Sequence, residues 1–215
     1  MSGNAMLDAV AAARIAVAEA APSSRLGALA RLAAAQTILG EHTNDPAWLE
    51  AAVATYGEAL AEAAGDDRAR MERNLGAVHC LLGRLTGDPS ALAQAVEHGR
   101  AAVESYVPGT ADWAMSNSNL ADALRVRGER TGDAGALNEA VAACRAALSV
   151  TPREAFPDDW AMTTTNLANA LAALGGAVRL AEAVALYEAA LEALDDARLA
   201  PAIRYNLDRA RRGRG

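Results

Sequence analysis

Two apolar patterns alternate along the chain, and each predicts an amphipathic helix. In the first pattern an aliphatic residue is followed three residues later by Ala-Val, and an Ala-Leu or Ala-Val pair comes seven residues after that. Spacings of three, four and seven place these side chains on one helical face. We call the predicted helices of this pattern the B helices. The pattern starts at Met6, Leu49, Leu92, Leu137 and Leu180.

The second apolar pattern lies between successive B helices and predicts what we call the A helices. Each is centred on a leucine, and asparagine directly precedes that leucine in four of the five copies, Leu32 being the exception. Because the connections are short, neighbouring helices are expected to be antiparallel. The predicted helices span residues 6–20, 24–40, 46–64, 67–84, 89–105, 111–129, 134–150, 158–174, 178–194 and 199–211.

One stretch of the chain repeats almost unchanged. DWAMSNSNLADAL, at residues 112–124, returns as DWAMTTTNLANAL at residues 159–171. Between A and B helices, Thr43-Asn44-Asp45, Thr86-Gly87-Asp88 and Thr131-Gly132-Asp133 combine a residue suited to a left-handed helix end with an aspartate suited to cap the next helix. Self-similarity at this length predicts stacked helix pairs.

The paired helices, the Asn-Leu A helix and the Ala-rich B helix resemble tetratricopeptide repeats, in a long-repeat bacterial variety that carries D-W-A-x-T-x-x-N-L followed by R-T-G-D. The resemblance covers nearly the whole chain and implies an all-α, right-handed solenoid of antiparallel helix pairs. Residues 1–215 would then form one repeat domain. Its expected parts are an unpaired helix at 6–20, repeats near 24–65, 66–108, 109–155 and 156–196, and a capping helix at 198–212.

Composition limits the function classes. The net charge of -7 argues against general nucleic-acid binding, and no apolar run is long enough for a membrane span, so we expect a cytoplasmic protein with neither partner. Cys80 and Cys144 have no CxxC motif or histidine at ligand spacing, which indicates reduced core thiols. Trp48, Trp113 and Trp160 stand near helix starts and are expected to pack against neighbouring helices rather than stack on a ligand.

The resemblance implies that one stripe of each A helix lines a concave groove that binds a peptide or protein. The stripe includes Met115 and Val126 in one A helix, Met162 in the next and Arg31 in the first. Its arginines outnumber its acids five to one, which favours an acidic partner. The candidate contacts are Arg70, Arg73, Asn74, Ser118, Asn119, Asp122, Arg125, Thr165, Asn166, Asn169, Tyr205, Asn206 and Arg209.

Three alternatives stay open at this stage. The asparagines could instead bridge adjacent A helices as a structural ladder, and the chain could self-associate through an unpaired first helix. An enzyme or binder of an anionic metabolite is the third. His79 takes an apolar position and is either a core residue or, with Glu72, a catalytic one, while His42 in a loop and His98 on a helix look isolated. We expect no enzyme activity, metal site or cofactor.

Overall fold

The computed structural model describes residues 3–194 and 200–213, and within them the chain forms ten α-helices and no strand. Every predicted helix is found, with ends that differ from the predicted ones by no more than three residues. The predicted boundaries at 196, 198 and 199 lie outside the described residues. The helices are α1 Gly3–Glu19, α2 Pro22–Thr43, α3 Pro46–Glu62, α4 Gly65–Thr86, α5 Pro89–Ser105, α6 Ala111–Thr131, α7 Ala134–Leu148, α8 Pro157–Leu174, α9 Ala177–Ala193 and α10 Ala200–Arg212.

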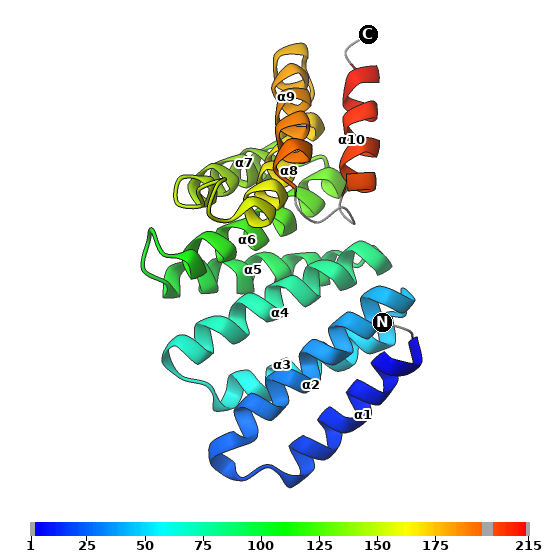
Figure 1. Ribbon diagram of the computed structural model, residues 1–215, viewed down its shortest axis with the longest axis vertical. Coiled ribbons are helices and arrows are strands. Elements are labelled where there is room, and N and C mark those ends of the chain that lie inside the picture. The colour runs from blue at the N-terminus through cyan, green and yellow to red at the C-terminus, as the bar shows by residue number, and fades with distance from the viewer. Residues whose placement is uncertain (1–2, 195–199, 214–215) are drawn as a thin grey trace. The chain divides into compact units, whose positions relative to one another are not determined.

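The helices belong to two compact units. Unit 1, Met1–Ser105, contains α1 to α5, and unit 2, Tyr106–Gly215, contains α6 to α10 (Figure 1). In both units each helix packs against the next one along the chain. The expected single solenoid across both units stays a prediction.

The turns between A and B helices follow the predicted capping chemistry. Asn44, Gly87 and Gly132 end α2, α4 and α6 with positive φ angles of 52°, 79° and 69°. The carboxylate of Asp45 accepts a hydrogen bond from the Ala47 amide at 3.0 Å, and that of Asp133 accepts one from the Ala136 amide at 3.1 Å. The left-handed residue ends one helix and the aspartate begins the next, so the chain reverses within two residues.

Small residues let the helices of a pair approach closely and fix them as antiparallel. A Cβ atom added at Gly83 of α4 would lie 2.6 Å from the Leu92 Cδ2 of α5, and one added at Gly76 would lie 3.1 Å from the Gly99 nitrogen. The Gly83–Leu92 contact lies near the turn, and the Gly76–Gly99 contact lies two helical turns further from it. Two helices that run in opposite directions from a turn meet at such pairs of residues. Gly40 against Leu49, and Gly128 against Leu137, repeat the first contact.

A helices also contact the A helix of the neighbouring pair. In unit 1 α2 packs against α4, and in unit 2 α6 packs against α8 and α8 against α10. Among the described residues B helices meet through long side chains, as in the Arg145–Glu182 ion pair between α7 and α9. The A helices of each unit therefore share one side, and the side chains between them can form a common surface.

The core is built mainly from the leucines and alanines of the two patterns. In unit 1 one buried cluster joins α2, α3 and α4 through residues such as Leu29, Tyr56 and Met71. A second cluster joins α1 and α2, with Trp48 packed against it, as expected for a tryptophan at a helix start. No helix among the described residues is long and apolar enough to cross a membrane.

Two expectations about local placement are wrong. His42 lies in the last turn of α2 and not in a loop, because α2 continues to Thr43. Val126 is 4% exposed, so the stripe of α6 turns into the core at that residue and does not present it to a partner.

Candidate functional site

The candidate contacts predicted from the A-helix stripe fall in both units. Those of α4 lie in unit 1, and those of α6, α8 and α10 lie in unit 2. Several of them interact with other side chains of the same unit. A group already engaged inside the protein is less available to a partner.

In unit 1 the stripe residues of α4 have partners within the unit. The Asn74 side chain is hydrogen-bonded to Tyr56 of α3, and burial, the largest cause, raises the pKa of that phenol. Arg70 forms an ion pair with Asp67 in the first turn of the same helix. Arg73 is half-buried and also interacts with neighbouring groups.

In unit 2 Arg125 is held by two carboxylates of its own helix. Its guanidinium lies 2.6 Å from Asp122 and 2.9 Å from Glu129, and its side chain is 12% exposed. Burial acts against the charge, but the two carboxylates outweigh it and the pKa of Arg125 is raised. This arginine neutralises the acids beside it.

One asparagine pair forms a bond of the structural-ladder kind. The Asn169 carbonyl oxygen on α8 accepts a hydrogen bond from the Asn206 amide on α10 at 3.0 Å and another from the Tyr187 hydroxyl on α9 at 2.6 Å. Burial raises the pKa of Tyr187 to about 12 and keeps it a hydrogen-bond donor. Asn169 and Asn206 thus link three helices.

The remaining predicted contacts of unit 2 differ in their surroundings. The Thr165 hydroxyl donates to the Ala161 carbonyl oxygen of its own helix at 2.8 Å. On α10 the Arg209 guanidinium lies over the exposed Tyr205 ring, 6.0 Å from its centroid. Asn166 is half-buried, and within the described part of the chain its side chain has no hydrogen-bond partner.

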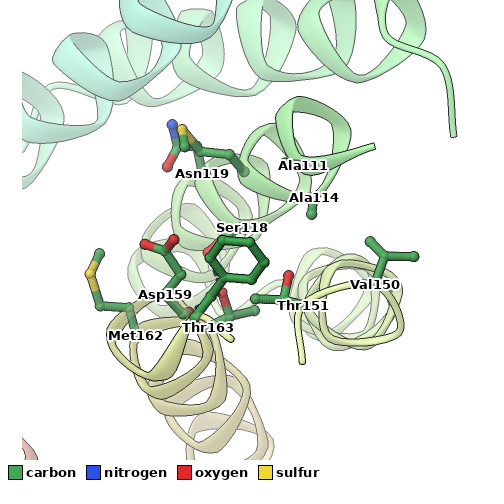
Figure 2. Close-up of a pocket in the computed structure, with 11 residues that line it drawn as sticks. Ala111, Ala114, Ser118, Asn119, Val150, Thr151, Asp159, Met162 and Thr163 are labelled. Carbon is green, nitrogen blue, oxygen red and sulfur yellow. Dashed lines mark hydrogen bonds between the residues drawn. The ribbon is translucent and has the colours of Figure 1, made fainter. Parts of the chain in front are cut away.

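A small pocket lies between α6 and α8 and is closed by the connection that precedes α8 (Figure 2). It has a volume of about 110 Å³. Met115 of α6, Met162 of α8 and Phe156 of the connection are each about half exposed around it. The lining residues are Ala111, Ala114, Met115, Ser118, Asn119, Val150, Thr151, Phe156, Asp159, Met162 and Thr163.

The polar lining of the pocket divides into engaged and available groups. The Ser118 and Thr163 hydroxyls are hydrogen-bonded to each other at 3.1 Å, which ties α6 to α8. The Thr151 hydroxyl donates to the Ala147 carbonyl oxygen at 3.0 Å. Among the described residues, the Asn119 amide and the Asp159 carboxylate have no hydrogen-bond or ion-pair partner, and Figure 2 shows both among the pocket's side chains.

The pocket therefore combines two predicted contacts, Ser118 and Asn119, and two residues of the predicted stripe, Met115 and Met162, with residues that were predicted neither as contacts nor as part of the stripe. Asp159 begins the second copy of the repeated stretch but is not among the predicted contacts, and neither is Phe156. The repeat in the sequence points to both α6 and α8, but only the path of the connection between α7 and α8 brings Phe156 to the same place. None of the predicted arginines lines the pocket.

Unit 1 contains a histidine cluster that the sequence did not indicate. His98 is not isolated, because its Nδ1 lies 2.6 Å from the buried Glu72 carboxylate and its ring is stacked on His79 with centroids 5.5 Å apart. His79 is 5% exposed, and burial, followed by the nearby His98, lowers its pKa to about 4. No group of three or more metal-ligating side chains occurs in the part of the chain that the structure describes.

Comparison with known proteins identifies the fold alone. No protein-family model matches the chain, and no curated protein sequence matches it. The structure is similar to the crystal structure of BtubC (BKLC) from P. vanneervenii, a structure of helical-repeat type, with a TM-score of 0.66 and 18% identity. The similarity covers 98% of this chain and 82% of that chain. The chain thus has an all-α fold of paired helices that resembles a helical-repeat protein.

Proposed function

We propose that this chain is a protein-interaction module, a tetratricopeptide-like solenoid that binds an extended segment of a partner protein. One side chain of the partner enters the pocket between α6 and α8. The observation that carries the proposal is the Asn119 amide, which lines the pocket without a side-chain partner among the described residues. An amide group at this place can pair with the donor and acceptor of one partner peptide unit.

The apolar residues around the pocket support a protein partner. Monomeric proteins seldom gather large exposed apolar side chains in one place without use for them, and Met115, Phe156 and Met162 are all exposed at this pocket. Methionine side chains adapt their shape to different partners. A volume of about 110 Å³ suits one side chain and is below the ~300 Å³ at which typical small-molecule sites begin. These features favour peptide binding over a metabolite-binding or enzymatic role.

The methionines of the chain offer a direct test. Met115 and Met162 line the pocket, whereas Met6 and Met71 are buried in unit 1. With methyl-¹³C methionine in the full chain, we titrate blocked heptapeptides of glycine and serine that carry norleucine or lysine at the centre. Saturable shifts are expected at Met115 and Met162 and not at Met6 or Met71, with a dissociation constant of about 1 mM for one buried side chain.

The matched variants for this test are Asn119→Ala and Asn166→Ala. Both remove the asparagine that precedes the repeat leucine, but only Asn119 lines the pocket. Losing one neutral hydrogen-bonding group is expected to weaken binding about fivefold in Asn119→Ala, with little change in Asn166→Ala. Absence of saturable shifts with every peptide, or equal binding by the two variants, would overturn the proposal.

Self-association is a second candidate function, supported by one observation. Leu7 and Ile15 of α1 are 46% and 59% exposed, although α1 packs against α2 and its Arg14 lies over the Trp48 ring of α3. Light scattering over a range of protein concentrations tests it. A concentration-dependent mass that falls to the monomer value in Leu7→Ser/Ile15→Ser supports self-association, and a constant monomer mass removes it.

A further inference from the structure

The charge of the pocket identifies the side chain that fits it. Asp159 is the one residue with a formal charge among the residues that line the pocket. Its carboxylate is exposed and, within the described residues, has no ion-pair partner. The arginines that favoured an acidic partner lie elsewhere, and Arg70 and Arg125 are paired with acids of their own helices.

We infer that the pocket binds a lysine or arginine side chain presented by an extended segment of a partner protein, with Asp159 as the residue that determines this specificity. The inference rests on the proposed function. Such a side chain has a long aliphatic part and a charged end. It can therefore contact both the apolar side chains around the pocket and the Asp159 carboxylate. The aliphatic part packs between Met115, Met162 and Phe156, and the charged end reaches the Asp159 carboxylate.

Two further features agree with a cationic side chain. The sulfur atoms of Met115 and Met162 and the ring of Phe156 are weakly electron-rich, and a cation near an aromatic face is stabilised. At the ~30 Å³ that one molecule of liquid water occupies, the volume of about 110 Å³ corresponds to roughly four water molecules, which accommodates one long side chain. An acidic side chain in this place would face Asp159 without a compensating cation among the lining residues.

The Asn119 amide explains why the cation should come from a protein segment and not from a free amine. Asn119 lies one turn beyond Met115 on α6 and lines the same pocket. Its amide supplies both a donor and an acceptor, which a peptide backbone can match and a simple alkylamine cannot. The exposed Phe156 ring and the two thioethers around the pocket also offer contact area to residues on either side of the inserted side chain.

The test compares side chains that differ only in charge. The full chain is titrated with the blocked heptapeptides carrying lysine, arginine, norleucine or glutamate at the centre, and Met115 and Met162 methyl shifts give the affinities. Norleucine has the length of the lysine stem without its charge. A partly exposed ion pair predicts about threefold to fivefold tighter binding of lysine than of norleucine, with a preference that weakens as salt is added.

Matched variants separate the pocket charge from the general charge of the region. Asp159→Asn removes the pocket carboxylate, Asp159→Glu retains it, and Asp158→Asn removes the neighbouring acid, which does not line the pocket. In Asp159→Asn the lysine and norleucine peptides are expected to bind about equally well. In Asp159→Glu and Asp158→Asn the lysine peptide is expected to keep its tighter binding. Circular dichroism at the titration temperature verifies that each variant is folded. If Asp159→Asn unfolds, the comparison of the lysine and norleucine peptides in the wild-type chain, with its dependence on salt, still decides whether the pocket prefers a cation.

The outcomes distinguish this inference from the function on which it rests. If norleucine and lysine bind equally, or if Asp159→Asn keeps the preference, the cation inference is wrong and peptide binding stands. If N-acetyl-lysine amide alone binds as tightly as the lysine peptide, the inference of a protein segment is overturned. If no peptide shifts Met115 or Met162, both the inference and the proposed function fail.

Discussion

At the scale of single residues, the histidine cluster of unit 1 illustrates how one substitution within a repeat changes the physics of a core position. His79 takes the place that Leu124 and Leu171 occupy in later repeats, and like them it is buried. Its Nδ1 has no hydrogen-bond partner within the described residues, while the ring stacks on His98. The position therefore tolerates an imidazole that stays neutral.

Acid should destabilise unit 1 through His79. Its pKa falls from 6.5 to about 4 on folding, so below 6.5 the unfolded chain binds the proton more readily. Stability is expected to decline by about 3 kcal/mol as the pH falls from about 6.5 to about 4. His79→Leu removes this contribution, and the difference is measured by urea unfolding across that pH range.

The control for this prediction is His42→Leu, which changes an exposed histidine of the same unit. It should keep the wild-type pH dependence. His98 and Glu72 remain in His79→Leu, as does Asp88, whose charge also acts on His79. If the free energy of unfolding of His79→Leu depends on pH as it does in the wild type, the acid sensitivity comes from those neighbours and not from His79.

Arg125 offers a second residue-scale prediction, because the sequence interpretation and the structure assign it different roles. Replacing Arg125 with Met leaves the half-buried Asp122 without its cation, and we expect a loss of about 1–3 kcal/mol of unfolding free energy. Arg70→Met breaks an exposed pair and should cost less than about 0.5 kcal/mol. Chemical denaturation measures both. The acidic-partner hypothesis would be supported if the two variants are equally stable and Arg125→Met no longer binds the glutamate peptide.

At the scale of helices, the pairing depends on glycine at one position of the A helix. Gly40, Gly83 and Gly128 each leave room for the first leucine of the following B helix. A methyl group there would meet the leucine side chain well inside normal contact distance. The requirement is steric, and it recurs where the chain turns from an A helix to a B helix.

Gly83→Ala should destabilise the protein, although alanine is the better helix former. The added Cβ would lie 2.6 Å from Leu92 Cδ2 and 3.2 Å from the Leu92 nitrogen, so the helices must separate. We expect a net cost of about 1–2 kcal/mol after the gain in helix propensity. Gly57→Ala is the control, because nothing lies within 4 Å of its added Cβ, and it should stabilise by up to about 1 kcal/mol. Thermal unfolding compares the two, and stabilisation by both would refute the steric account.

The helices were predictable from the sequence because local signals agree with one another. Ala-rich apolar spacing sets each helix, and left-handed residues such as Gly87 and caps such as Asp133 set its ends. The pocket was only half predictable. Ser118 and Asn119 follow from the repeat, and Asp159 of α8 begins its second copy, but Phe156 reaches the pocket through the irregular connection before α8, which has no periodic signal. The pairing of Arg125 and the approach of His98 to Glu72 depend on side-chain contacts that spacing alone does not determine.

At the scale of the whole molecule, the histidine cluster and the pocket belong to different units. Every pocket residue belongs to unit 2, while His79, His98 and Glu72 belong to unit 1. In repeat proteins stability is approximately a sum of local terms, so a change in one region need not unfold another. The methionines report on each unit independently, with Met71 in unit 1 and Met162 in unit 2.

This division predicts that destabilising unit 1 leaves peptide binding intact. In Gly83→Ala we expect a temperature range in which the Met6 and Met71 signals have moved to unfolded positions, while Met115 and Met162 still shift with the lysine peptide. The affinity in that range should equal the wild-type value within about twofold, because no residue that lines the pocket comes from unit 1. The titration is followed by methyl NMR as the temperature is raised. Simultaneous loss of all four signals would mean that the units unfold as one body, and coupling between them would then have to be included in any account of binding.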